Sequence, residues 1–441
     1  MSQATQEPAQ HILHAPTQRD IVAVIVRRLV PFLCLIFLVN YLDRTNVAMA
    51  KLAMLKDTGI SESQYGYAAG FFFFIGYFIF EVPSNLILER VGARIWITRI
   101  MVSWGLICSA LMFAHNATSF YILRFLLGVA EAGFFPGIVL YLTYWIPSSR
   151  RAGVLAAFLI STAVSGLVGN PLAGLLMKMD GLGGLHGWQW LFVIEGLMPI
   201  SLGAVTFVIL PDKPKDAKWL SADEVNWIEA ELSREHVDHH GHHVAELKLA
   251  LRDHRLWLLG VIYFMLIMGL YGFIFWVPTI VKSAGTLTNF QVGLISAIPF
   301  LVAAVSMVLI GRHADHKNER RAHVATCAIV AAIGMAIISQ CHTVASVIPA
   351  LCFAAIGIFG SLGPFWALST RFLKGTAAAG GIAIVNSIGA CAGMVAPSAV
   401  GWAKERYNSF TYGLLLVSAA LVCGAVLVML VPKRVDRAMP N

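Results

Sequence analysis

The sequence predicts an all-α membrane protein in which twelve transmembrane helices form two repeats of six. Of its 441 residues, 58% are hydrophobic and only 13% are charged, and the mean hydropathy is +0.73. Soluble domains carry about 25% charged residues, so this chain has too few charges to cover a core in water. A loop motif that pairs an acid with a base also occurs once in each half of the chain.

Each predicted span is a run of about 20 mostly apolar residues, the length that crosses a bilayer as a helix. The runs cover 29–49, 65–88, 94–113, 118–146, 151–178, 188–210, 256–280, 290–311, 322–341, 344–372, 376–402 and 410–432. A charged stretch separates the first six from the last six. The expected parts are an N-tail (1–28), a first bundle (29–210), a linker (211–255), a second bundle (256–432) and a C-tail (433–441).

The Lys and Arg residues indicate the orientation of the chain. Short loops and tails on the side of the termini carry sixteen of them, against six on the other side. Positively charged loops remain in the cytoplasm, so we expect both termini and the linker to be cytoplasmic. This placement accounts for the net charge of +8 without a basic binding face, and we therefore expect no nucleic-acid partner.

The linker contains two distinct segments. Residues 221–232 begin with a serine cap and an acidic first turn, and they predict an amphipathic cytoplasmic helix. The His-rich stretch 236–243 has irregular spacing and no nearby cysteine, so we expect a solvated loop rather than a metal site. The seven cysteines show no metal-ligand spacing and are expected to be free thiols. We predict neither a metal nor an organic cofactor.

The repeated loop motif follows span 2 and span 8. Asn85, Glu89 and Arg94 recur 226 residues later as Gly311, Asp315 and Arg320. An acid and a base at one spacing, at the same corner of each half, indicate two parallel six-helix repeats, which is a transporter architecture. We predict a cytoplasmic gate of ion pairs here, with solvated surface charge as the alternative. Its residues are Glu89, Arg90, Arg94, Asp315, Arg320 and Arg321, with a contribution from Glu81.

Four charged residues lie within the predicted spans 1 and 4. Asp43 and Arg44 are in span 1, while Arg124 and Glu131 are seven residues apart on one face of span 4. Charges inside a membrane are costly and usually line a cavity or form pairs. The set is neutral and becomes positive on protonation, so it is suited to capturing an anion; two structural ion pairs between the spans are the alternative. Glu81 and Glu195 are further candidates, for which we favour structural pairing over proton binding.

The acidic–basic loops resemble the signature loop of the major facilitator superfamily. Four longer segments resemble its anion:cation symporter family, in particular bacterial tartrate-type transporters. These segments are NYLDRTNVAMA (40–50), FEVPSNLILERVGARIW (80–96), RFLLGVAEAGFFPGIVLYLTYWIP (124–147) and GTAAAGGIAIVNSIG (375–389). The similarity extends over roughly residues 20–432, with Asn85 replacing the glycine that opens the superfamily loop.

The resemblance implies roles for individual residues. Asp43 and Glu131 would carry protons, Arg44 would anchor the substrate, and Arg124 would pair with Glu131 and the substrate. Four further residues would hydrogen-bond substrate hydroxyls: Tyr41, Tyr77, Trp366 and Asn386. The alternative for a single membrane Tyr or Trp is packing or interface anchoring. No catalytic residue is expected.

The predicted function is secondary active transport: proton-coupled uptake of a small organic anion, such as tartrate or a sugar acid, by alternating access. Organic-anion exchange or uniport is an alternative within transport. A transporter-like sensor or a membrane enzyme is an alternative of another class, and no Cys/His/metal constellation or Gly-x-Ser-x-Gly elbow within the spans supports an enzyme. We expect a monomeric multi-pass protein of the bacterial inner membrane whose partners are the anion and the lipid bilayer, with protons as the coupling ion.

Overall fold

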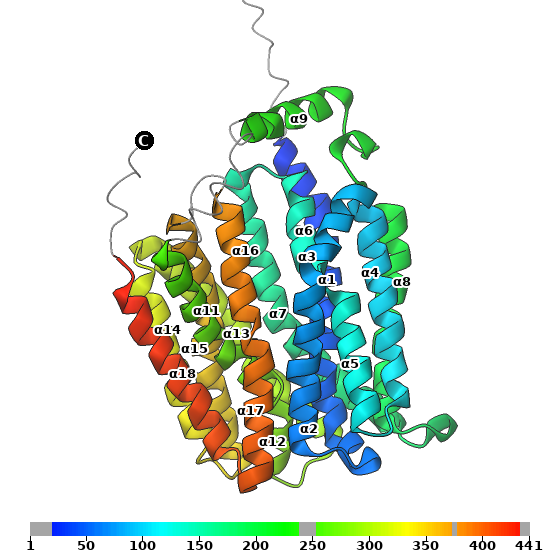
Figure 1. The fold of residues 1–441 in the computed structure, drawn as a ribbon, viewed down its shortest axis with the longest axis vertical. Helices are drawn as coiled ribbons and strands as arrows, with labels where there is room; N and C mark the ends of the chain where they lie inside the picture. The colour runs from blue at the N-terminus through cyan, green and yellow to red at the C-terminus, as the bar shows by residue number, and fades with distance from the viewer. Residues whose placement is uncertain (1–19, 238–252, 373–376, 433–441) are drawn as a thin grey trace, which may run out of the picture.

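The computed structural model describes residues 20–237, 253–372 and 377–432, and the regular elements in these ranges are helices (Figure 1). Twelve helical segments are long and apolar enough to cross a membrane, which confirms the predicted fold class. The start of the described chain, the linker helix and the end of the last helix lie at the same end of the bundle, here called the linker end.

The first half contains six spans, two of which are interrupted. Its elements are α1 (Ile21–Thr58), α2 (Glu62–Tyr67), the π-helical η1 (Ala68–Phe72), α3 (Phe73–Val91), α4 (Ala93–Ala110), α5 (Ala117–Glu131), α6 (Phe134–Thr143), α7 (Ser148–Leu176) and α8 (Gly187–Ile209). α2, η1 and α3 form span 2, while α5 and α6 form span 4.

The second half repeats this plan after the linker. Its elements are α11 (His254–Ile274), α12 (Val277–Ser283), α13 (Asn289–Lys317), α14 (Arg321–Ile338), α15 (Val344–Phe372), α16 (Ala377–Ala390), α17 (Ala392–Tyr407) and α18 (Thr411–Leu430). α16 and α17 both belong to span 11. The linker helix α9 (Ala222–Val237) is the predicted amphipathic helix, with Ser221 at its cap and Ile228 buried.

Helix α1 extends well beyond its predicted range of 29–49. The carboxylate of Asp20 accepts a hydrogen bond from the Ala23 amide at its start, and Gly59 ends it in the left-handed conformation (φ 68°). The Asp20 cap satisfies a backbone amide that the helix start leaves unpaired, and the left-handed conformation at Gly59 turns the chain out of the helix. Lys51, two residues beyond the predicted end of the first span, is consequently a buried residue of α1.

The two halves pack against each other along two helix pairs, α7 with α13 and α2 with α17. At each pair a glycine faces backbone of the other half. A Cβ atom added to Gly293 would lie 2.3 Å from the Asn170 carbonyl oxygen, and one added to Gly66 would lie 2.6 Å from that of Pro397. Small residues at such positions let membrane helices approach closely. Helix α2 and the adjoining part of α17 lie at the end of the bundle opposite α9, so the halves meet at the end away from the linker (Figure 1).

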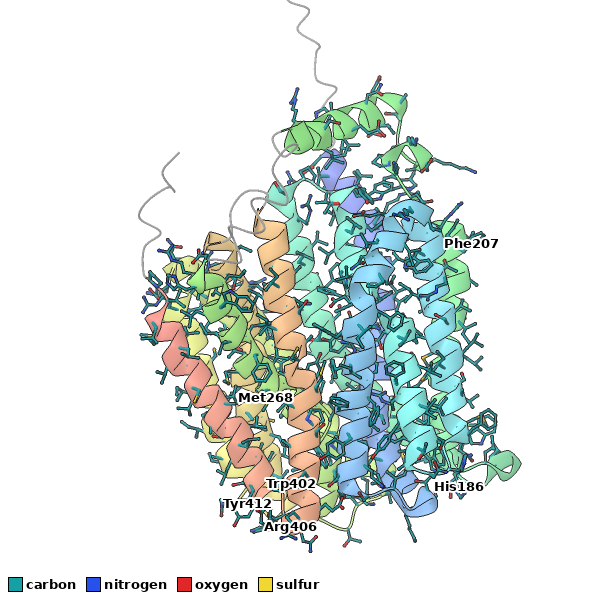
Figure 2. The ribbon with its side chains drawn as sticks, viewed as in Figure 1. His186, Phe207, Met268, Trp402, Arg406 and Tyr412 are labelled. Atoms are coloured by element: carbon teal, nitrogen blue, oxygen red, sulfur yellow. The ribbon has the colours of Figure 1, made fainter. Side chains whose placement is uncertain are left out.

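Exposed aromatic and polar side chains mark that end of the bundle. Trp402, Arg406 and Tyr412 lie there, with His186 at the same end and Phe207 near the linker end (Figure 2). Trp402 and Tyr412 are about half exposed, and the ring of Tyr407 lies 4.4 Å from that of Tyr412. Trp and Tyr concentrate at the surface of a bilayer, so these rings are suited to the membrane interface.

Candidate functional site

A buried ion pair between Arg44 and Glu131 joins α1 to α5. The side chains of Arg44 and Glu131 are 9% and 1% exposed. Both Nε and Nη2 of Arg44 donate to the same oxygen, Oε1, and the Nε–Oε1 distance is 2.9 Å. Asn40, one turn earlier on α1, donates to this oxygen as well, at 2.7 Å. The other oxygen, Oε2, is buried and has no hydrogen-bond partner among the described residues.

Aromatic rings enclose the guanidinium of Arg44. Its Cζ lies 5.3 Å from the ring centroids of both Tyr41 and Tyr77, and 5.4 Å from that of Phe73. A fourth ring, that of Tyr271 from α11, lies against Phe74 at 4.6 Å and within electrostatic reach of Arg44. The predicted residues Tyr41 and Tyr77 therefore do lie beside Arg44, and the second half contributes to the same site.

Glu131 occupies the last residue of α5, where span 4 breaks. Gly133 adopts φ 82°, and a Cβ there would meet the Ser84 hydroxyl at 2.4 Å. A residue with a side chain would be both strained and obstructed at this position, so the break requires glycine. The break ends the helix at Glu131, and the carboxylate reaches Arg44 across the gap between α5 and α1.

The structure contradicts the prediction that Arg124 pairs with Glu131. Arg124 is fully buried, and its guanidinium donates to the carbonyl oxygens of Ala68 and Ala69 at 3.4 and 3.3 Å and lies over the Phe73 ring. Arg124 and Glu131 lie about 10 Å apart along the axis of α5, and no ion pair joins them among the described residues, because Glu131 is bound to Arg44. The π-helical turn η1 presents carbonyl groups outside the regular hydrogen-bond ladder, and Arg124 binds two of them.

Asp43 does not join the other three charges either. Successive residues on a helix point about 100° apart, so Asp43 and Arg44 face different neighbours. The indole of Trp104 on α4 donates to Oδ2 of Asp43, while Asn46 and the thiol of Cys108 each lie 3.5 Å from Oδ1. The predicted four-charge cluster is thus divided into three parts: the Arg44–Glu131 ion pair beside the second half, Arg124 at the carbonyl groups of η1, and Asp43 enclosed by α4 and α8.

The two predicted substrate contacts in the second half lie on different helices. Trp366 of α15 packs against Tyr263 of α11, with ring centroids 4.9 Å apart. Asn386 lies half-buried on α16. Tyr263 also stacks on Phe365 at 4.9 Å. These contacts show aromatic packing around Trp366, and contact of Trp366 or Asn386 with a substrate stays a prediction.

Lys51 bridges the two halves at the end of the bundle away from the linker. Its Nζ lies 2.5 Å from Glu62 and 3.7 Å from the centroid of the Trp276 ring, which belongs to the second half. Nearby, the Tyr65 hydroxyl donates to the Phe275 carbonyl at 3.2 Å, and Glu405 accepts from the Ser61 hydroxyl at 2.6 Å. Lys51 thus lies between an acid of the first half and a desolvated aromatic ring of the second half. The two contacts stabilise the packing of the halves at this end.

The predicted cytoplasmic gate is only partly paired. Asp315 and Arg320 form an ion pair at 3.2 Å, within the second half. Arg94 pairs with Asp212 rather than with Glu89: its amide donates to Oδ1 at 2.8 Å, and its Nε lies 4.0 Å from Oδ2. Arg321 donates to the Met429 carbonyl at 2.7 Å, and Glu89 and Arg90 are exposed. None of these described contacts joins the first half to the second: Arg94 binds Asp212 at the start of the linker, and the others lie within the second half. A gating role stays a prediction.

Several residues of the site were absent from the sequence-based prediction. Asn40 could have been found, since it lies one turn before Arg44 on the same face of α1. Trp104 and Tyr271 carried no such signal, because their partners come from distant helices. The prediction of free thiols is confirmed for all seven cysteines. The His-rich stretch 236–243 lies largely outside the described residues, as do both tails beyond residues 20 and 432.

The two six-helix halves, and the buried charges beside their contact, define the protein as a membrane transporter rather than a membrane enzyme. The chain belongs to the Major Facilitator Superfamily, whose sequence model matches residues 33–397. This assignment confirms the resemblance of the loops after spans 2 and 8, and it makes the chain a multi-pass membrane protein.

Relatives with assigned names are similar over nearly the whole chain. A "Putative tartrate transporter" of Agrobacterium vitis is 45% identical over 94% of this chain and 92% of its own length. The "Quinolone resistance transporter" of Acinetobacter baumannii is 39% identical over 95% of this chain and 96% of its own. Among solved structures, the inward-facing, occupied form of a bacterial homologue of the human lysosomal transporter Spinster is similar, with a TM-score of 0.74 and 16% identity, over 91% of this chain and 95% of that one. This last similarity supports the fold alone.

Proposed function

We propose that the protein takes up a small organic anion together with protons, by alternating access across the inner membrane. The observation that carries this proposal is the Arg44–Glu131 ion pair, which is buried, asymmetric and enclosed by tyrosines. Removing one partner of a buried pair leaves an uncompensated charge, so neutralising Glu131 releases Arg44 to bind another anion. The names of the tartrate-type relatives agree with a carboxylate as that anion.

In this scheme the carboxylate of Glu131 and the carboxylate of the substrate alternate as partners of Arg44. A proton binds Glu131 at the free oxygen Oε2 and removes its negative charge. Arg44 then binds a substrate carboxylate through its planar fork, and Tyr41 and Tyr77 supply hydroxyl groups for a polar substrate. Loss of the proton at the linker end restores the ion pair and displaces the anion. A second proton is assigned to Asp43, which directly precedes Arg44 in α1 and whose carboxyl faces α4.

Transport by proteoliposomes tests this function. A thermal-shift screen of carboxylates on the purified protein would first select the substrate, with tartrate as the initial candidate. Uptake should then be concentrative under an imposed pH gradient, inside alkaline, and should collapse when an uncoupler dissipates that gradient. Uptake that survives the uncoupler would instead favour exchange or uniport. Asp43→Asn should abolish accumulation while leaving exchange of bound substrate measurable.

A further inference from the structure

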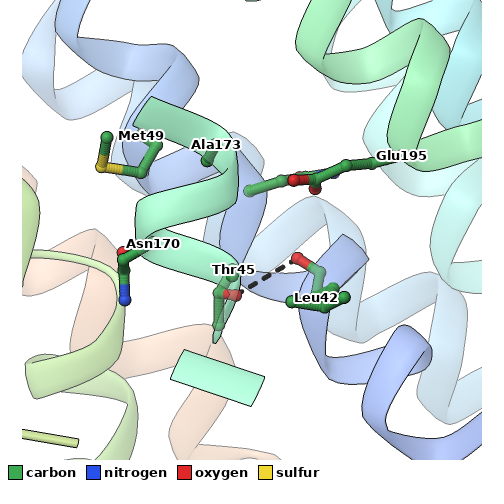
Figure 3. A pocket seen from close by; sticks show the side chains of 8 residues that line it. Leu42, Thr45, Met49, Asn170, Ala173 and Glu195 are labelled. Atoms are coloured by element: carbon green, nitrogen blue, oxygen red, sulfur yellow. Dashed lines mark hydrogen bonds between the residues drawn. The ribbon is translucent and has the colours of Figure 1, made fainter. Parts of the chain in front are cut away.

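Glu195 is a fully buried acid to which the transport cycle above assigns no role. It lies in α8, is 1% exposed, and neither of its carboxyl oxygens has a hydrogen-bond partner among the described residues. We expected it to form a structural pair, and the structure contradicts that expectation. The side chain points from α8 toward α1 and lines a narrow gap between α1, α7 and α8 (Figure 3).

Asn46 connects this gap with Asp43. Its side chain lines the gap, its amide nitrogen lies 3.5 Å from Oδ1 of Asp43, and its own Oδ1 is buried without a partner. The thiol of Cys108 lies 3.5 Å from the same oxygen of Asp43 and 3.9 Å from the Phe192 carbonyl of α8. Asp43 and Glu195 therefore belong to one buried polar cluster, which spans α1, α4 and α8.

No Lys or Arg side chain among the described residues pairs with Glu195 as a counter-ion. Asp43 on α1 and Cys108 on α4 are the titratable groups that face the cluster from the neighbouring helices. The charges of Arg124 and Glu131, both on α5, affect Asp43 electrostatically in opposite directions. Helix α7 contributes Asn170, which is neutral and whose amide donates to the Gly166 carbonyl at 2.7 Å. An ionised carboxylate here would be both dehydrated and unpaired, which is far more costly than the neutral acid.

We propose that Glu195 is a third proton-carrying group, which exchanges its proton with Asp43 in each transport cycle. In the described state the gap has no room for a water molecule, so the proton on Glu195 is occluded. When the halves move and the gap widens, Asp43 first releases its own proton toward the linker end, and the proton of Glu195 then passes to the Asp43 carboxylate and leaves by the same route. Two protons leave the cluster in each cycle, and both acids are protonated again from the other side of the membrane before the next one. This inference rests on the proposed proton coupling and deepens it.

A proton suits the site better than a metal cation. A monovalent cation needs several oxygen ligands and space for itself, and the gap does not admit even water. The hydroxyl of Thr45, which also lines the gap, already donates to the Tyr41 carbonyl at 2.9 Å. The unpartnered oxygens are those of Glu195 and Asn46, and a protonated Glu195 carboxyl is a suitable donor for the free oxygen of Asn46.

The number of charges moved per substrate tests the proposal. Reversal potentials in proteoliposomes, at fixed gradients of pH and substrate, give the ratio of protons to substrate. We expect Glu195→Gln to lower this ratio by one relative to the wild type. The matched comparison is Glu229→Gln, which makes the same substitution on the exposed face of α9 and should leave the ratio unchanged. An unchanged ratio in Glu195→Gln, or an equal decrease in Glu229→Gln, would overturn the proposal.

Two further measurements make the result decisive. Infrared difference spectroscopy of the wild type should show the carbonyl band of a protonated carboxylic acid that shifts in Glu195→Asp, and a band that does not respond would contradict the proposal even if Glu195→Gln fails to fold. Replacing sodium by choline should not alter wild-type uptake; a sodium requirement that Glu195→Gln removes would reassign the site to a cation. Absence of proton coupling in the wild type would refute the proposed function itself, whereas intact coupling with an unchanged ratio in Glu195→Gln would refute only this inference.

Discussion

Arg44 binds only one of the two carboxylate oxygens of Glu131. Nε and Nη2 of the guanidinium both reach Oε1, together with the amide of Asn40, and Oε2 is left buried and free. A bidentate pair would occupy both oxygens of the acid. The second oxygen has no partner among the described residues, and it is the position that the proposed coupling assigns to the proton.

Arg44→Lys should weaken substrate binding although it keeps the charge. Lysine lacks the planar fork that holds a carboxylate through two hydrogen bonds. We expect affinity to fall by about 1.5–3 kcal/mol, or roughly tenfold to 150-fold, in calorimetric titration with the selected carboxylate. Arg99→Lys is the control, since Arg99 is exposed on α4 over the ring of Trp96. An unchanged affinity would make Arg44 a purely structural partner of Glu131.

Glu131→Gln should uncouple transport without preventing binding. A neutral amide imitates the protonated acid, so Arg44 becomes free for the substrate at any pH. We expect accumulation under a pH gradient to be lost, while substrate exchange continues and binding no longer depends on pH. Glu229→Gln on the exposed face of α9 removes the same charge and should behave as the wild type. Concentrative uptake by Glu131→Gln would remove this acid from the coupling path.

Lys51→Met should open the end of the bundle away from the linker. The ammonium of Lys51 is buried against Trp276, and a desolvated cation–π contact is worth about 2 kcal/mol. Lys178 makes a contact of the same length, 3.7 Å, with Phe290 across the other helix pair, but it is exposed. Such a contact is worth only about 0.5–1 kcal/mol.

Spin labels at Lys56 and Arg406 provide the readout, because both residues are exposed and lie in different halves. Pulsed dipolar spectroscopy should show a larger population of long distances in Lys51→Met than in the wild type. Lys178→Met should change the distribution little. Equal shifts in the two variants would show that burial of the lysine is not what closes this end.

Gly128→Ala should destabilise the first half. A Cβ at this position would lie 2.0 Å from the Phe73 carbonyl oxygen, and both groups are backbone-bound, so a helix must move. Overpacking of this kind costs about 1–3 kcal/mol. Gly311→Ala is the matched control, because nothing lies within 4 Å of its Cβ. Thermal unfolding in detergent should show a lower Tm for Gly128→Ala only, and equal Tm values would contradict the close packing of α5 on η1 and α3.

The sequence alone was sufficient to predict the twelve spans, the two repeats and most of the charged residues inside the membrane, although not Lys51. The physical reason is that lipid forces every spanning segment to be an apolar helix, so a charge within one is conspicuous. The family resemblance indicated Tyr41 and Tyr77 as substrate contacts; the structure places both rings beside Arg44, and their contact with a substrate stays a prediction.

Only the tertiary structure decided which charges meet. Whether Glu131 pairs with Arg124 or Arg44 depends on the break at Gly133 and on the distance between α5 and α1, and neither is encoded in local periodicity. The separation of Asp43 from Arg44, and the exclusion of partners and water from Glu195, likewise arise from where α4 and α8 pack against α1. Long-range packing sets these contacts because each joins side chains that lie tens to more than a hundred residues apart in the chain.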